Sequence, residues 1–173
     1  MTVGHAFKWA ATALLIAGCA SMGAAGSRAT AALAPTAGNS TAGKVTFTRN
    51  GDRVRVVAEI SGLAAGAHGF HIHEKGDCSA SDATSAGGHF NPGNQPHGNP
   101  AAGAHHAGDM PLLIADASGN ATIDVTLSTI SIGSGANDIV GRAVVIHKDP
   151  DDFKTQPAGN SGARIACGVI VAA

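Results

Sequence analysis

The sequence predicts an all-β domain, an antiparallel Greek-key sandwich or flattened barrel of about eight strands with two long functional loops. Three observations support this fold class. Short runs of alternating apolar and polar residues recur along the chain, 24 glycines and other turn-forming residues separate them, and no stretch has a long period of 3.6 residues. Two segments, residues 79–111 and 148–163, lack strand patterning, and loops of that length are usually functional.

The first 18 residues are predicted to be a secretory signal. Lys8 precedes the apolar run 9–17, which is too short to span a bilayer as a helix. The run ends in Leu15-Ile16-Ala17-Gly18-Cys19, which resembles the cleavage box of bacterial lipoproteins. We therefore expect Cys19 to be lipidated, to become the first mature residue and to anchor the chain to membrane lipid. The alternative is an ordinary signal that is cut near Ala24 or Ala25.

Residues 19–43 are rich in Ala, Gly, Ser and Thr, which predicts a flexible tether, with residues 29–34 as a possible weak edge strand. The β domain is expected from residue 44 to residue 173. In its first strand Val45 and Phe47 alternate with threonines, and Asn50-Gly51 predicts a hairpin turn into the alternating run 53–56. The remaining strands are expected at residues 69–73, 121–127, 143–147 and 164–171.

Charge and cysteine content restrict the partners and the compartment. The formal net charge is −1 and the sequence forms no basic patch, so a nucleic-acid partner is not expected. The chain has three cysteines. If Cys19 carries lipid, Cys78 and Cys167 remain as a pair that an oxidising compartment would bridge. Two free thiols are the alternative.

Nine histidines are an unusual number for a chain of this size, and histidine is the commonest metal ligand. His71 and His73 lie two residues apart on an expected strand, so their side chains share one face. His147 ends another strand. The first long loop contributes His89, His97, His105, His106 and Asp109. Imidazoles with one carboxylate suit zinc, and four nitrogen ligands suit copper(II). An exposed histidine-rich loop would explain the loop residues but not those on the strands.

The chain also resembles a known family in six short blocks that follow one another in order. These blocks are Gly69-Phe70-His71-Ile72-His73-Glu74, Gly76-Asp77-Cys78, Gly87-Gly88-His89-Phe90-Asn91-Pro92, His106-Ala107-Gly108-Asp109, Gly141-Arg142-Ala143-Val144-Val145-Ile146-His147 and Gly162-Ala163-Arg164-Ile165-Ala166-Cys167-Gly168. Together they resemble copper,zinc superoxide dismutase of the exported bacterial type, over about residues 44–171.

The resemblance implies one copper and one zinc ion per subunit. It assigns the copper ligands as His71, His73, His89 and His147, and the zinc ligands as His89, His97, His106 and Asp109. His89 would bridge both ions and, with Arg164, take part directly in catalysis. Asp151 would link His71 to His97, and His68 would have a structural hydrogen-bonding role.

The activity implied is the dismutation of superoxide to oxygen and hydrogen peroxide in the periplasm or cell envelope, which would protect the envelope against oxidative damage. Copper would accept and return one electron, His89 would supply a proton, and Arg164 would dock the anion. Lys75, Lys148 and Lys154 could draw anions inward. The chain would act as a monomer or a homodimer. The alternatives are a non-catalytic protein that buffers copper or zinc, and a zinc hydrolase, which needs an open zinc position.

Overall fold

The computed structural model describes residues 1–4 and 27–173. The predicted signal segment, except for its first four residues, and Cys19 therefore lie outside the described residues. Within the part that is described, no helix has the length and apolar character needed to cross a membrane.

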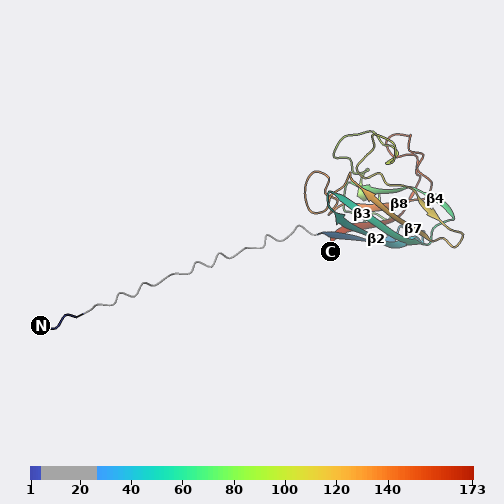
Figure 1. Ribbon diagram of the computed structural model, residues 1–173. Coiled ribbons are helices and arrows are strands. Elements are labelled where there is room, and N and C mark those ends of the chain that lie inside the picture. Colours follow the sequence, from blue (N-terminus) through green and yellow to red (C-terminus); the bar gives the residue numbers. More distant parts are fainter. Residues whose placement is uncertain (5–26) are drawn as a thin grey trace.

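Nine antiparallel strands and one short 3₁₀ helix make up the domain (Figure 1). The strands are β1 (Arg28–Pro35), β2 (Ala42–Asn50), β3 (Arg53–Ser61), β4 (Gly66–His68), β5 (Phe70–His73), β6 (Leu113–Ala115), β7 (Ala121–Leu127), β8 (Ala143–His147) and β9 (Arg164–Ala172), and the 3₁₀ helix is Thr84–Ala86. Seven strands form one sheet in the order β5-β8-β9-β1-β2-β3-β7, and β4 pairs with β6. The all-β fold is thus confirmed, and the long loop after β5 arches over the strands in Figure 1.

Alternation of side chains explains how the sheet forms its core. On β2, Val45 and Phe47 are fully buried, while the threonines between and after them face outward. The same period of two places Val54 and Val56 of β3 inside the barrel. The hairpin between β2 and β3 pairs Asn50 with Arg53, so the turn residues are Gly51 and Asp52, one position later than the Asn-Gly pair predicted. Gly51 has φ +64°, which glycine adopts without steric cost.

The N-terminal boundary of the domain differs from the prediction. Residues 28–35, expected within a flexible tether or at most as a weak edge strand, form β1 in the middle of the sheet, with β2 on one side and β9 on the other. Ala29, Ala31 and Leu33 point into the core. Alanine has a low intrinsic preference for strands, so the local pattern was weak, and pairing with two neighbours decides the conformation.

Strand β5 positions the candidate site because both of its faces are buried. Phe70 and Ile72 pack in the hydrophobic core, as predicted, and His71 and His73 point to the opposite face. The long loop covers that second face and pairs its main chain with β5 at two points, His71 with Asp109 and His73 with His89. This covering removes the histidines of β5 from water.

Candidate metal centre

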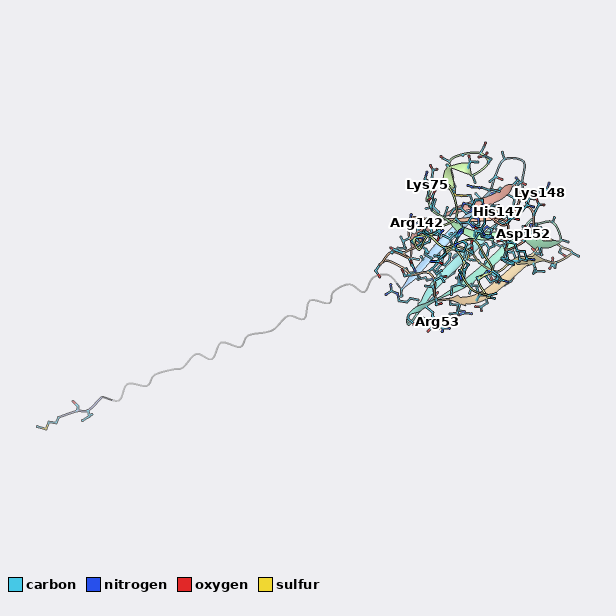
Figure 2. All side chains as sticks on the ribbon, turned by 90° about the horizontal axis from the view of Figure 1, so that it is seen from above. Arg53, Lys75, Arg142, His147, Lys148 and Asp152 are labelled. Carbon is cyan, nitrogen blue, oxygen red and sulfur yellow. A yellow bond between two sulfur atoms is a disulfide. The ribbon has the colours of Figure 1, made fainter. Side chains whose placement is uncertain are left out.

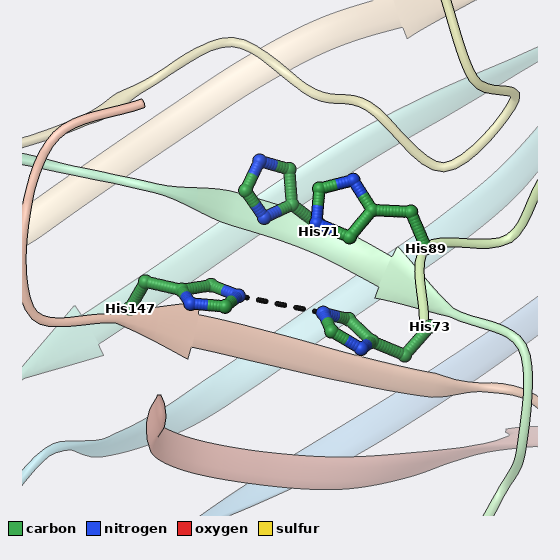
Figure 3. Close-up of side chains that lie close together, drawn as sticks. All are labelled: His71, His73, His89 and His147. Atoms are coloured by element: carbon green, nitrogen blue, oxygen red, sulfur yellow. Dashed lines mark hydrogen bonds between the residues drawn. The ribbon is translucent and has the colours of Figure 1, made fainter. Parts of the chain in front are cut away.

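The first cluster of histidines joins two neighbouring strands and the long loop. Its members are His71 and His73 on β5, His147 at the end of β8 and His89 in the loop, and all four are buried. One ring nitrogen from each lies within 4.8 Å of the others. Figure 3 shows the four rings converging on a common point between the strands and the loop. The structure therefore brings together the four residues expected to bind copper.

Hydrogen bonds to carbonyl groups set the orientation of two of these rings. His73 Nδ1 donates to the Gly87 carbonyl at 2.9 Å, and His147 Nδ1 donates to the Gly162 carbonyl at 3.2 Å. Each Nε2 atom is then left with a lone pair, and the two Nε2 atoms face each other at 3.4 Å (Figure 3). Buried His71 Nδ1 and His89 Nε2 have no hydrogen-bond partner. Converging lone pairs in a dry pocket are a fit for a cation.

The second cluster consists of His89, His97, His106 and Asp109, again all buried. The Nδ1 atoms of the three histidines lie 2.9, 3.1 and 3.4 Å from Asp109 Oδ1. Asp109 Oδ2 accepts hydrogen bonds from the backbone amides of Gly98 and His106, which fixes the carboxylate in place. The ring of His89 belongs to both clusters, with Nε2 turned to the first and Nδ1 to the second.

Asp151, in the loop between β8 and β9, connects the two clusters. His71 Nε2 donates to Asp151 Oδ2 at 2.7 Å, and His97 Nε2 donates to Asp151 Oδ1 at 2.9 Å. These bonds leave Nδ1 of both rings without a proton, as metal binding requires. For His97 this lone pair faces the Asp109 carboxylate, an arrangement that is repulsive unless a cation lies between them. The link predicted for Asp151 is present in the structure.

The protonation states of the site also suit metal binding. Burial lowers the pKa of His71 and His73 well below the ordinary value, and electrostatic repulsion among the neighbouring histidines lowers it further. Burial lowers the pKa of His147 to about 4. Burial alone would raise the pKa of Asp109, but hydrogen bonds from His89 and the Gly98 amide outweigh burial and lower it to about 2. Uncharged rings beside an ionised carboxylate are the forms that bind metal at pH 7.

Arg164, at the start of β9, is held by the long loop. Its Nη1 donates to the Ala83 carbonyl and its Nη2 to the Gly87 carbonyl, both at 2.7 Å. The Gly87 carbonyl is also the acceptor for His73, so one loop residue positions Arg164 and a ring of the first cluster. The disulfide between Cys78 and Cys167, which the structure contains with a Cα–Cα distance of 5.8 Å, ties this loop to β9.

Two further histidines lie near the clusters without joining them. The ring nitrogens of His68 lie 2.9 Å from the carbonyl oxygens of His147 and Ala64, so this side chain supports the end of β8. His105 Nδ1 donates to the His106 carbonyl, and His105 belongs to neither group. Of the two adjacent histidines, the structure places His106 beside Asp109, as the spacing indicated.

The residues predicted for the site did not include Gly159, which leaves space for Asp151 and for His97 of the second cluster. A Cβ atom on Gly159 would lie 1.7 Å from Asp151 Oδ1 and 2.6 Å from His97 Nε2. Gly159 also has φ +66°, a conformation unfavourable for other residues. In the sequence this glycine stands in Pro157-Ala158-Gly159-Asn160, which looks like an ordinary turn, so only its spatial neighbours reveal its role.

Comparisons with known proteins agree with this geometry. The family described as copper/zinc superoxide dismutase matches residues 41–170. An extracellular superoxide dismutase [Cu-Zn] of Caenorhabditis elegans is 43% identical over 134 residues, which are 74% of this chain and 60% of that protein. The chain thus spans less than two thirds of the length of this relative.

The fold is similar to a solved structure as well. The crystal structure of the clock protein EA4 superposes with a TM-score of 0.79 at 40% sequence identity, covering 86% of this chain and 96% of that one. The family match over residues 41–170 spans most of the chain, and the chain therefore belongs to the copper/zinc superoxide dismutase family.

Proposed function

We propose that this protein is a copper,zinc superoxide dismutase, which converts two superoxide anions and two protons into oxygen and hydrogen peroxide. The proposed copper ligands are His71, His73, His89 and His147, and the proposed zinc ligands are His89, His97, His106 and Asp109. The observation that carries the proposal is the ring of His89, which turns one nitrogen to each cluster. Copper, when bound, supplies a centre that gains and loses one electron, and zinc supplies a fixed positive charge.

The residues of the chain account for the remaining requirements of this reaction. Arg164 keeps its positive charge at all relevant pH values and, held by two loop carbonyls, provides a fixed docking point for a small anion. His89 can hold a proton at Nε2 and pass it to the reduced product, because its Nδ1 stays fixed beside Asp109. Lys75 and Lys148 are exposed and are labelled on either side of His147 in Figure 2, and their charges would attract anions.

The protein is further proposed to act in the cell envelope, anchored to a membrane through lipidated Cys19. The extracellular relative supports export, and the disulfide between Cys78 and Cys167 fits an oxidising compartment. Mass spectrometry of the mature N-terminus tests the anchor. A lipidated cysteine at position 19 is expected as the first mature residue, and an unmodified N-terminus beyond residue 19 would exclude it.

Substitution of His147 tests the activity. His147→Ala removes one proposed copper ligand and none of the proposed zinc ligands, so zinc content should stay unchanged. Copper affinity and the rate of superoxide removal should each fall at least about 100-fold, since even the loss of a partner behind a ligand costs 10 to 100-fold. Metal analysis and direct observation of superoxide decay measure both effects.

His105→Ala is the matched control, because His105 lies next to the second cluster but belongs to neither. It should keep both metals and full activity. A His147→Ala variant that turns over superoxide at the original rate would refute the proposed function.

Superoxide removal by the unsubstituted protein should also slow as ionic strength rises, since salt screens the attraction of an anion to Arg164.

A further inference from the structure

The side chain of Gln156, in the loop between β8 and β9, binds the main chain of His97 in the other long loop. Gln156 Oε1 accepts a hydrogen bond from the His97 amide, and Gln156 Nε2 donates one to the His97 carbonyl, both at 2.9 Å. The same Nε2 approaches the Lys154 carbonyl at 3.3 Å. The planar amide thus pairs with both polar main-chain groups of His97, as a neighbouring strand would.

This contact matters because His97 has no other main-chain support. His97 follows Pro96, lies outside any strand, and takes part in no backbone–backbone hydrogen bond within the described part of the chain. Its side chain is held by Asp151 at Nε2 and faces Asp109 at Nδ1. Gln156 therefore binds both polar main-chain groups of His97, beside the bond from the Gly98 amide to Asp109, and it comes from the same loop as Asp151.

The exposure of the Gln156 side chain distinguishes its support of His97 from ordinary packing in a core. Gln156 lies on the surface, whereas His97 is buried with 3% of its surface accessible. An exposed glutamine contributes little to a core, so its two bonds to one residue act mainly on the position of that residue. We propose that Gln156 is a positioning residue that holds His97 in place for zinc, an inference that rests on the zinc site proposed above.

The contact is specific to one of the two clusters. His97 belongs to the second cluster only, while Asp151 supports His71 of the first cluster as well. Loss of the Gln156 contact should therefore weaken zinc binding and leave copper binding unchanged. General disorder of the loop between β8 and β9 would release Asp151 and weaken both metals, which gives the experiment a way to tell positioning from a purely structural role.

The experiment uses Gln156→Met, which keeps the length of the side chain and removes both hydrogen bonds. Zinc affinity is measured on copper-free protein by competition with a chromophoric chelator, copper affinity is measured separately, and hydrogen exchange reports on the His97 amide. Zinc affinity should fall about 10-fold, the size typical of losing a partner behind a metal ligand. The His97 amide should exchange faster and copper affinity should not change.

Gln95→Met is the matched control, because Gln95 is also exposed in the loop that carries His97 but its side chain donates only to the Gly93 carbonyl within its own turn. It should leave zinc affinity unchanged. Unaltered zinc affinity in Gln156→Met, or equal loss of zinc and copper, overturns the positioning role. Failure of the proposed zinc site itself is seen in a different variant, because His97→Ala would then bind zinc as tightly as the original chain.

Discussion

Gly159 lies so close to Asp151, the residue that links both clusters, that a Cβ atom at position 159 would overlap its carboxylate. Asp151 accepts hydrogen bonds from His71 and His97, and the space above its Oδ1 atom is open only because residue 159 has no Cβ. The site therefore depends on the missing side chain of Gly159 as well as on the side chains that could bind metal. The planes of the two rings are inclined at 81°, so the carboxylate cannot accept from both rings if an added methyl group displaces it.

Gly159→Ala should therefore lower the affinity for both metals about 10-fold or more, because the added methyl group displaces Asp151. Metal retained after dialysis against a chelator measures this loss. Gly135→Ala is the control, since Gly135 has a similar positive φ of +82° but open space where its Cβ would lie. It carries comparable backbone strain and should keep both metals. Equal retention by the two variants would show that Asp151 does not need the space.

At the scale of elements, the two long loops are attached to the sheet at a few points. Main-chain pairs join the first loop to β5, and the disulfide between Cys78 and Cys167 joins it to β9 across 89 residues of sequence. β1 contributes from the other side, because Thr36, just after it, donates through its amide and its Oγ1 to the carbonyls of Ile165 and Arg164. Arg164 is thus fixed through both its side chain and its backbone.

Removal of the disulfide by the double substitution Cys78→Ser and Cys167→Ser should reduce the free energy of unfolding by about 4.5 kcal/mol, the value for closing a loop of this length. In a protein of this size the melting temperature should fall by about 10 °C. Calorimetry of the metal-free protein measures the change. Cys19→Ser, which leaves the bridge intact, should melt at the original temperature. An unchanged melting temperature in the double variant would show that the bridge contributes no stability.

At the scale of the whole molecule, the buried histidines make the metal-free fold sensitive to acid. Burial lowers the pKa of His147 to about 4 in the folded protein, against an ordinary value of 6.5, and lowers the pKa of His71 and His73 in the same direction. The unfolded chain therefore binds more protons than the folded chain below pH 6.5. Stability must then fall as the pH falls through this range.

The metal-free protein should consequently have its full stability above about pH 6.5 and lose stability progressively toward pH 4. Asp109, with its pKa lowered from 3.8 to about 2, adds a further loss of stability only below about pH 4, as the pH falls toward 2. Melting temperatures at pH 7, 5.5 and 4.5, followed by circular dichroism, check the slope. His147→Gln should reduce it, because the side chain no longer titrates. A melting temperature independent of pH over this range would contradict the buried, neutral state of the rings.

Much of the fold followed from local patterns. The runs at β2, β3, β5, β7, β8 and β9 were predicted near their observed positions. β2, β3 and β7 have one face in the core and carry a period of two, whereas β5 and β8 are buried on both faces and were found as short runs bounded by turns. The three-residue strands β4 and β6 were not predicted, since they are too short to show a period. The role of β1 was underestimated, because its alanines acquire their strand conformation from the strands on either side.

The sequence by itself determined the family, the types of side chain available for metal binding and the pairing of His71 with His73 on one face of a strand, since these depend on residue identity and on the geometry of a single strand. Only the tertiary structure decided that His89 turns one nitrogen to each cluster, that Gly159 leaves room for Asp151 and that Gln156 supports His97. These contacts join segments from about ten to sixty residues apart, and no local pattern encodes which loop atoms meet when the chain folds.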